Sequence, residues 1–311
     1  MGRHCWLYGW CRSVFCRPPE AISIFKEGPY SMNLKRRLPN DRTFEQIKNH
    51  YQVEKSIALK LKSASREERR ALYPHIYDEL FKKVPDHPRL RRIEDSEEIT
   101  ALNRKKLEMA KKYLNESVIF VEFAPGDCHF ASYVTQFVKY VYAIDISDQR
   151  SPAFKTPDNF RLVLYDGYDL DLKENSADVV FSDQLIEHLH PEDVEFHFEL
   201  IKRILRDKGV YIFRTPHAFF GPHDISKYFS EEPEGFHLKE WTYSEIEQIL
   251  KRANYSFWHG FLRIKKKYIR IPFGYFKLVE IMLQNLPRKQ RRFFSRFFLS
   301  RQMLVIGGKF S

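Results

Sequence analysis

The sequence predicts an α/β protein with a parallel, doubly wound sheet, and two observations support this prediction. From Val118 onward, short apolar runs typical of strands alternate with stretches whose apolar residues recur at helical spacing. The first run, "VIFVEFA" (118–124), is apolar almost throughout, as is usual for a strand buried on both faces. Alternation of this kind builds a parallel sheet with helices packed on its faces.

Seven strands are predicted, and the first four end in or beside an acid. They cover residues 118–124, 140–147, 160–166, 177–183, 209–215, 255–264 and 302–308. The helix before the fifth strand has Pro191 at its first position and Glu192 and Asp193 near the positive end of its dipole. Gly209 is predicted to end that helix.

Composition and periodicity divide the chain into segments. Residues 41–117 have helical periodicity, broken at Pro85 and Pro88. The first 31 residues are rich in Trp and Cys and lead into no periodic pattern, so we expect a non-structural leader and a biological start at Met32. The predicted segments are a leader (1–31), a helical extension (32–117), an α/β core (118–263), an insert (264–301) and a last core strand (302–311).

The bulk composition narrows the class of protein. The chain has 311 residues, 43% of them hydrophobic, and no apolar run approaches the length of a membrane span. Its four cysteines suit no disulfide framework and have no zinc-ligand spacing, so we expect a cytoplasmic protein without a metal site.

The charge is concentrated in the insert. The net charge is +11, and residues 263–301 hold twelve Lys/Arg, eight aromatic residues and one acid, Glu280. Three interpretations stay open. The insert is a solvated helical flap, a membrane-surface element with Phe293, Phe294, Phe297 and Phe298 among arginines, or a nucleic-acid-binding segment. The last is disfavoured because no RNA-binding module is visible in the rest of the chain.

The carboxyl ends of the strands hold the candidate ligand-binding residues, because ligands of such sheets bind at that edge. The dinucleotide pattern G-x-G-x-x-G, laid on residues 124–129, keeps only Gly126. Asp127 stands where a pyrophosphate would have to sit, which argues against NAD or FAD. A cofactor without phosphates fits better. The candidates are Glu122, Gly126, Asp127, Asp145, Asp166, Asp183, Gln184, Glu187 and His188.

These strand ends resemble the class I S-adenosylmethionine-dependent methyltransferases, which have a Rossmann-like, doubly wound, seven-stranded sheet. Their first motif, an acid followed by glycines at alternate positions, corresponds to Glu122-x-Ala124-x-Gly126-x-Cys128, where Ala124 and Cys128 depart from glycine. The resemblance covers about residues 118–255. The other matching motifs are Asp145 in "AIDIS", Asp166 in "LYDGYDL" and the run "SDQLIEHLHPED".

The resemblance implies S-adenosylmethionine as cofactor and a role for each matching residue. Glu122 and Gly126 would border its methionine part, and Asp145 would accept both ribose hydroxyls. The other implied contacts are Asp166 and Gly167 with the adenine, Asp183 and Gln184 near the sulfonium, and Ala124, Asp127 and Ile146 elsewhere in the cofactor site.

Three further stretches, "EHLHPED", "TPHAFFGPHDISKYF" and "GFHLKEWTYSEI", resemble a bacterial subgroup of these enzymes. Its members often accompany enzymes that build cell-surface polysaccharide or lipid-linked glycans. The helical stretch "REERRALYPHIYDELFKKVPDHP" resembles the subgroup's N-terminal extension. The acceptor implied is a glycan precursor or a related small molecule.

Histidines after the fourth and fifth strands are candidates for a general base, which an acceptor hydroxyl would need. They are His188, His217, His223 and His237. We select His188 and His223, with Asp224 placed to orient the latter, as catalytic candidates.

The sequence and its resemblance therefore predict a cytoplasmic methyltransferase that transfers a methyl group to an oxygen of a small molecule or of a cell-surface glycan or lipid-linked precursor. The insert would contact the inner membrane surface peripherally. Two alternatives stay open: an RNA methyltransferase that uses the basic insert, and an inactive binding module with the same fold.

Overall fold

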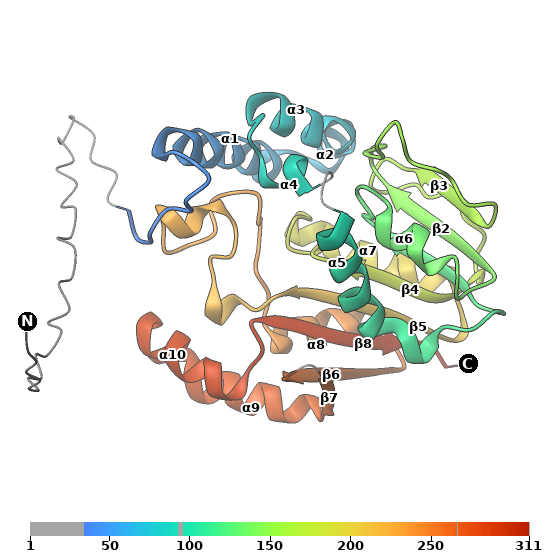
Figure 1. Cartoon of the computed structure of the whole chain (residues 1–311). Coiled ribbons are helices and arrows are strands. Elements are labelled where there is room, and N and C mark those ends of the chain that lie inside the picture. Colours follow the sequence, from blue (N-terminus) through green and yellow to red (C-terminus); the bar gives the residue numbers. More distant parts are fainter. Residues whose placement is uncertain (1–33, 93–95, 266, 311) are drawn as a thin grey trace, which may run out of the picture. The chain divides into compact units, whose positions relative to one another are not determined.

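The computed structural model describes residues 34–92, 96–265 and 267–310 (Figure 1). The predicted leader, 1–31, and the predicted start at Met32 lie outside these residues. An eight-stranded sheet has the order β3-β2-β1-β4-β5-β8-β6-β7. The strands are β1 (Ile119–Phe123), β2 (Tyr140–Asp145), β3 (Phe160–Leu164), β4 (Ala177–Asp183), β5 (Leu205–Pro216), β6 (Phe257–Ile264), β7 (Lys267–Ile271) and β8 (Gln302–Gly308).

The sheet is mostly parallel, as predicted. Strands β1 to β5 pair in parallel, whereas β8 runs antiparallel to both β5 and β6. The strand order reverses between β1 and β4, which marks the switch point where ligands of such sheets bind. The prediction of seven strands was wrong by one, because β7 extends the edge as a hairpin with β6.

Helices cover both faces of the sheet because alternate residues of each buried strand point to opposite faces. On one face Phe120 packs with residues of α5 (Ser96–Ala110) and α6 (His129–Val134). On the other, Val121 and Phe123 pack with residues of α7 (Pro191–Ile204), α8 (Tyr243–Arg252) and α9 (Phe273–Gln284).

The prediction that Gly209 ends α7 was wrong. The helix ends at Ile204, and Leu205 enters β5 at once by pairing with Ala177. Gly209 lies inside β5, where a Cβ would approach the Arg206 carbonyl to 2.8 Å. The glycine therefore serves close backbone approach at an irregular strand start rather than a helix cap.

Helices occupy the N-terminal part of the described chain: α1 (Phe44–Ser63), α2 (Arg66–Leu72), η1 (Tyr73–His75), α3 (Ile76–Lys83) and α4 (Pro88–Arg92), followed by α5 and η2 (Lys111–Tyr113). Capping boxes begin α1 and α2, with Thr43 and Ser65 as the N-caps. The buried faces of α1 and α3 form a separate apolar cluster with Tyr168, Phe236 and Leu238. Because these three residues come from loops near the strand ends, the helical extension borders the predicted site.

Residues 264–301 contain β7, α9 and α10 (Arg288–Phe298). Helix α9 buries Phe273 and Phe276 against the core. Its Glu280 accepts hydrogen bonds from the backbone N–H groups of Tyr243 (2.6 Å) and Ser244 (2.9 Å) at the start of α8. The one acid of this segment thus anchors it by capping a core helix.

Two short helices, η3 (Ala218–Phe220) and η4 (Ile225–Tyr228), follow β5.

Among the described residues, no helix combines the length and the apolar character that crossing a membrane would require.

Candidate cofactor and acceptor site

The loop after β1 has left-handed backbone at alternate residues. Ala124, Gly126 and Cys128 have φ angles of 53°, 61° and 62°. The methyltransferase motif has glycines at these positions. Ala124 and Cys128 replace two of them here and still adopt the backbone conformation that favours glycine. A non-glycine residue in this region costs roughly 1–2 kcal/mol. The loop therefore keeps its shape at a cost in strain.

Asp145, at the end of β2, ties this loop to the neighbouring strand. Its carboxylate accepts hydrogen bonds from the backbone N–H groups of Gly126 (3.0 Å) and Ile146 (2.7 Å). The side chain is buried, and burial raises its pKa despite these bonds. Asp145 is thus held at the sheet's switch point by both strand ends.

Glu122 lies deep beneath the loop. Its carboxylate pairs with the ammonium of Lys106 on α5 at 3.3 Å, and its Oε2 has no hydrogen-bond partner among the described residues. Burial raises its pKa to about 7. A buried carboxylate oxygen without a partner is costly unless a ligand's donor reaches it.

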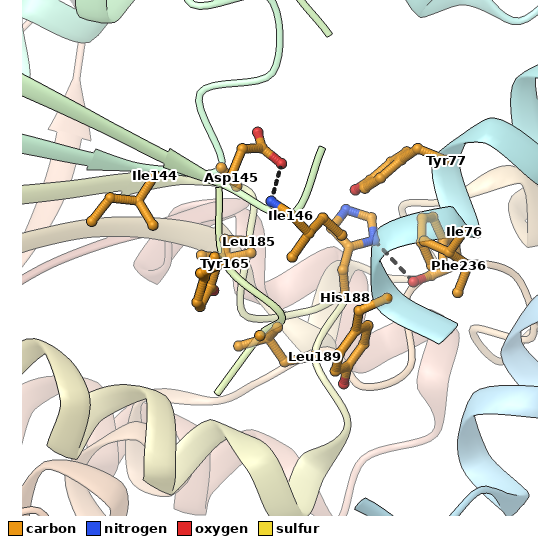
Figure 2. A pocket seen from close by; sticks show the side chains of 13 residues that line it. Ile76, Tyr77, Ile144, Asp145, Ile146, Tyr165, Leu185, His188, Leu189 and Phe236 are labelled. Carbon is orange, nitrogen blue, oxygen red and sulfur yellow. Dashed lines mark hydrogen bonds between the residues drawn. The ribbon is translucent and has the colours of Figure 1, made fainter. Parts of the chain in front are cut away.

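A cavity lies at the carboxyl ends of β1, β2 and β4 (Figure 2). Four predicted cofactor residues line it: Ala124, Asp145, Ile146 and Gly167. The other lining residues are Tyr73, Ile76, Tyr77, Ile144, Tyr165, Leu185, His188, Leu189 and Phe236. This lining of apolar side chains with a few polar groups is typical of small-molecule sites.

The helical extension covers the cavity, which sequence analysis missed. Tyr73, Ile76 and Tyr77 line it from η1 and α3, and a Cβ on Gly126 would overlap the Arg89 guanidinium of α4. The cavity encloses about 50 Å³, against roughly 300–1,000 Å³ for typical ligand sites. A ligand as large as an adenosyl group therefore enters only when covering side chains move outward.

Asp166, predicted to contact the adenine, and Asp127, predicted to lie in the cofactor site, each bond the backbone of their own turn. Asp166 accepts hydrogen bonds from the N–H groups of Tyr168 (2.9 Å) and Asp169 (2.7 Å), and pairs with Arg70. Asp127 accepts from the N–H of His129 at the start of α6. Neither side chain lines the cavity.

The two residues predicted near the sulfonium are also engaged elsewhere. Asp183 holds Arg214 through two bonds of 2.6 and 2.7 Å. Gln184 donates a 2.7 Å hydrogen bond to Gln302 of β8. These contacts join β4 to β5 and β8 at the site's border.

His188 is the predicted catalytic residue that lines the cavity. Its Nδ1 lies 2.9 Å from the Phe236 carbonyl oxygen, so this nitrogen carries the proton and Nε2 is the acceptor (Figure 2). Burial, followed by the nearby charge of His237, lowers its pKa to about 3. His188 is therefore a neutral imidazole at neutral pH.

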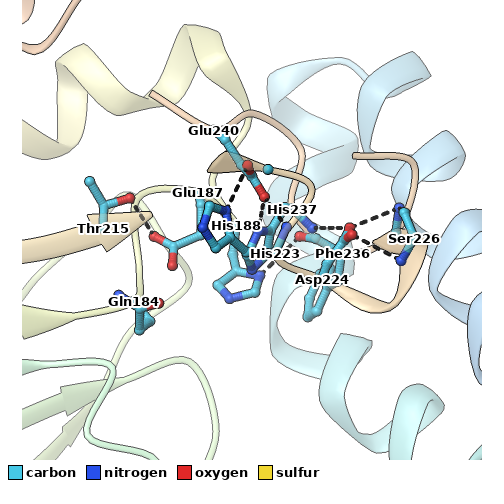
Figure 3. A network of polar contacts seen from close by, with 12 residues as sticks. Gln184, Glu187, His188, Thr215, His223, Asp224, Ser226, Phe236, His237 and Glu240 are labelled. Carbon is cyan, nitrogen blue, oxygen red and sulfur yellow. Dashed lines mark hydrogen bonds and ion pairs between the residues drawn. The ribbon is translucent and has the colours of Figure 1, made fainter. Parts of the chain in front are cut away.

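His223, the second predicted catalytic residue, pairs with Glu240 rather than with the predicted Asp224. Its Nδ1 lies 3.0 Å from Glu240 Oε2 (Figure 3). Asp224 instead accepts hydrogen bonds from the N–H groups of Ser226 and Gly235, both at 3.0 Å, and so orders its own loop. Neither His223 nor Asp224 lines the cavity.

Glu187 and His237 adjoin His188. Glu187 is fully buried, accepts a 2.9 Å hydrogen bond from Thr215, and burial raises its pKa to about 7. His237 Nδ1 lies 2.9 Å from Glu240. Burial alone would lower the pKa of His237, but the hydrogen bond with Glu240 and the charge of Glu187 raise it to about 9.

His217, in contrast, is structural. It is fully buried, and its Nε2 lies 2.9 Å from Glu280.

The fold and the site together indicate a class of enzyme. A mostly parallel sheet, a loop of alternating left-handed residues and a buried acid at the next strand end are features of the methyltransferase-like α/β fold. Residues 121–213 also match the family model described as a methyltransferase domain. Residues 121–213 thus carry a methyltransferase domain, which supports the prediction of an enzyme with S-adenosylmethionine as its cofactor.

The chain is similar to several solved methyltransferase structures, one of them with a TM-score above 0.5. Phosphoethanolamine N-methyltransferase 1 of Haemonchus contortus, solved with phosphoethanolamine and S-adenosylhomocysteine, is 14% identical with a TM-score of 0.53, over 80% of this chain and 50% of that one. A SAM-dependent methyltransferase of Thermotoga maritima is 14% identical with a TM-score of 0.48, over 74% of this chain and 97% of that one. One from Archaeoglobus fulgidus is 14% identical with a TM-score of 0.47, over 68% and 94%. No curated protein matches the chain in sequence.

Proposed function

We propose that the protein methylates a hydroxyl oxygen of a small molecule, with a cell-surface glycan or lipid-linked precursor as the favoured acceptor class. One observation carries the assignment of the acceptor position. The neutral imidazole of His188 lines the same cavity as Asp145, the predicted ribose-binding acid. A cofactor on Asp145 and an acceptor beside His188 would therefore meet in one enclosed space.

The residues present fit the cofactor. The unpartnered Oε2 of buried Glu122 can accept a hydrogen bond from the cofactor's ammonium group. The guanidinium of Arg89, which lies against Gly126, can bind its carboxylate. Asp145 presents a buried carboxylate to the ribose hydroxyls. When bound, S-adenosylmethionine supplies a methyl carbon made electrophilic by its positively charged sulfur.

The protein's contribution is placement and water exclusion. Methyl transfer is an in-line displacement, so holding the acceptor oxygen close to the methyl carbon supplies much of the rate enhancement. Tyr73, Ile76 and Tyr77 exclude water from the cavity. The Nε2 lone pair of His188 can hold the acceptor hydroxyl, because Nδ1 is bonded to Phe236.

Methyl-labelled S-adenosylmethionine tests this proposal against a panel of nucleotide sugars, lipid-linked saccharides, amines and RNA. We expect a labelled methyl ether on a hydroxylated acceptor, and at least about a hundredfold lower kcat/KM in His188→Asn. The asparagine amide can keep the hydrogen bond to Phe236 but lacks Nε2. His75→Asn, at an exposed histidine of η1, is the matched control.

Other products would contradict the assignment. Label on nitrogen would exclude O-methylation, and label on RNA would favour the RNA alternative. Binding of S-adenosylhomocysteine without product from any acceptor class would favour an inactive binding module.

We also propose that α9 and α10 contact an anionic membrane surface from the cytoplasmic side. Leu278, Ile281 and Met282 of α9 are exposed by 57–69%, and Phe293 and Phe297 of α10 by 53% and 67%. Apolar side chains beside a basic helix face are typical of interfacial helices.

Arginines crowd the same region. The pKa of Arg292 is lowered, first by burial and then by Arg36, Arg301, Arg296 and Arg288. Cations held this close repel one another, so an anionic surface would stabilise the group. Each Lys or Arg near such a surface contributes about 1 kcal/mol.

Vesicle sedimentation tests this contact. The full chain is expected to bind phosphatidylcholine vesicles that contain phosphatidylglycerol, and the double variant Phe293→Ser/Phe297→Ser to bind at least about tenfold more weakly. Leu59→Ser is the control, since Leu59 of α1 is 60% exposed but lies outside this segment. Equal binding by all variants would exclude the contact. Steeply salt-dependent RNA binding that needs residues 264–301 would favour the nucleic-acid alternative.

A further inference from the structure

Three side chains of the kinds that bind metal ions lie close together beside the cavity. Glu187 and His188 lie in the loop after β4, and His237 lies in the loop between η4 and α8 (Figure 3). One ligand atom from each lies within 4.8 Å of one from each of the others. His237 follows His188 by 49 positions in the chain, so sequence spacing does not reveal this cluster.

Glu187 contains an atom that the protein leaves unsatisfied. The residue has no exposed surface, and its Oε2 accepts the hydrogen bond from Thr215. Its Oε1 has no hydrogen-bond partner among the described residues. Burying a carboxylate oxygen in this way is costly, so the atom points to a ligand.

Both histidines are oriented as metal-binding histidines are. His188 uses Nδ1 toward the Phe236 carbonyl oxygen at 2.9 Å, and His237 uses Nδ1 toward the Glu240 carboxylate at 2.9 Å. In both rings, Nε2 is therefore the nitrogen left available to bind an ion. A ligating histidine almost always bonds its second nitrogen to a carboxylate or backbone carbonyl, which fixes the ring and its tautomer.

We propose that Glu187, His188 and His237 bind a divalent first-row transition-metal ion such as Zn²⁺ or Mn²⁺. One carboxylate and two imidazoles form the facial donor set that such ions accept, with positions left for other ligands. In a facial set, bonds of about 2.0–2.2 Å place the ligand atoms roughly 3.0–3.5 Å apart. From the observed upper limit of 4.8 Å, the side chains would close by at most about 1–2 Å when an ion binds. Mg²⁺ prefers oxygen ligands and should bind more weakly.

A second cluster of similar composition carries no such inference. His50, Glu54 and His87 also lie close together. The ring nitrogens of His50 contact Arg42 (2.9 Å) and Glu54 (2.7 Å), and the second oxygen of Glu54 accepts from the N–H of Phe236. Its central atoms are already paired, so this cluster is a closed structural network.

The ion's role rests on the proposed O-methylation, whereas its binding does not. The cluster shares His188 with the cavity, so an open position on the ion would face the acceptor. A hydroxyl oxygen bound there would lose its proton to water more easily, because the ion lowers the hydroxyl's pKa. His188 would then act as a ligand rather than as the proton acceptor.

Calorimetric titration of the metal-stripped full chain with Zn²⁺ alone and Mn²⁺ alone tests the site. We expect one ion per chain, weaker binding of Mg²⁺, and about a hundredfold or greater loss of affinity in Glu187→Gln, His188→Asn and His237→Asn. These substitutions keep the bonds to Thr215, Phe236 and Glu240 available while removing the ligand atom. His75→Asn should bind as the unmodified chain does, and circular dichroism checks that each variant is folded.

The outcomes separate this inference from the proposed function. An absence of stoichiometric binding, or equal affinity in all variants, would overturn the site and show that Glu187 and His237 form only a charge pair. If S-adenosylhomocysteine stabilises the same preparation and methylated product still forms in the presence of a chelator, the methyltransferase proposal stands. The proposed role of the ion is then rejected. Ion binding at these residues without product from any acceptor would support the site and reject the proposed acceptor class.

Discussion

Replacing Asp145 by alanine is expected to abolish the thermal stabilisation of the protein by S-adenosylhomocysteine. Asp145 lines the cavity, its carboxylate holds the N–H groups of Gly126 and Ile146, and it is the acid predicted to accept the ribose hydroxyls. A ligand at about a hundred times its Kd adds roughly 2.7 kcal/mol to the free energy of unfolding. For a chain of this size that is a rise in Tm of about 4 °C.

The measurement compares Tm for the full chain with S-adenosylmethionine, S-adenosylhomocysteine and NAD. NAD should give no shift, because the loop lacks the glycines that a pyrophosphate needs. Asp145→Asn can keep one of the two backbone bonds and separates loss of charge from collapse of the loop. Asp148→Ala, an exposed acid three residues on, should leave the shift intact. A full shift in Asp145→Ala would remove this residue from the cofactor site.

Replacing Asp193 by asparagine is expected to lower the free energy of unfolding by about 3–5 kcal/mol at neutral pH. Asp193 of α7 accepts two hydrogen bonds from Arg69 of α2, at 2.7 and 2.9 Å, and others from Tyr168 and Tyr73. Arg69 is only 2% exposed. The substitution would leave a buried guanidinium with no carboxylate partner other than Glu192, whose side chain is 72% exposed, and would loosen the helical extension from the core.

The effect should depend on pH with a definite sign. Burial raises the pKa of Asp193, but the hydrogen bonds from Arg69 and Tyr168 outweigh burial and hold it below the ordinary value. A depressed pKa in the folded state contributes stability above the unfolded-state pKa of about 3.9, and this contribution is lost as the pH falls through the folded-state value. The difference between the unmodified chain and Asp193→Asn should therefore shrink below about pH 4.

Urea unfolding at several pH values checks both statements. Glu195→Ala is a matched control on the same helix, because the Glu195–Arg252 pair is 2.6 Å long but 36% and 51% exposed. That variant should lose less than about 1 kcal/mol. Equal losses in the two variants would show that the buried pair contributes no more than a surface pair.

Local pattern was enough to predict the cofactor edge. Strand ends are short-range features, so an apolar run followed by an acid was enough to select Asp145, which lines the cavity; its contact with the ribose stays a prediction. Asp166 and Asp183 were selected in the same way but do not line the cavity, since a strand-end carboxylate can equally bond its own turn or a neighbouring arginine. Which of these it does depends on Arg70 and Arg214, residues that sequence spacing does not connect to the strand ends.

Sequence pattern was enough to predict the mostly parallel α/β sheet, because strand and helix periodicities are local. The cofactor was predicted through the resemblance of the strand-end motifs to those of S-adenosylmethionine-dependent methyltransferases. Packing between distant elements explains why η1 and α3 line the cavity, why β7 adds an eighth strand, and why Glu240 rather than Asp224 holds His223. It alone brought His237 to Glu187 and His188, because contacts between distant loops depend on how whole elements pack, which no local pattern records.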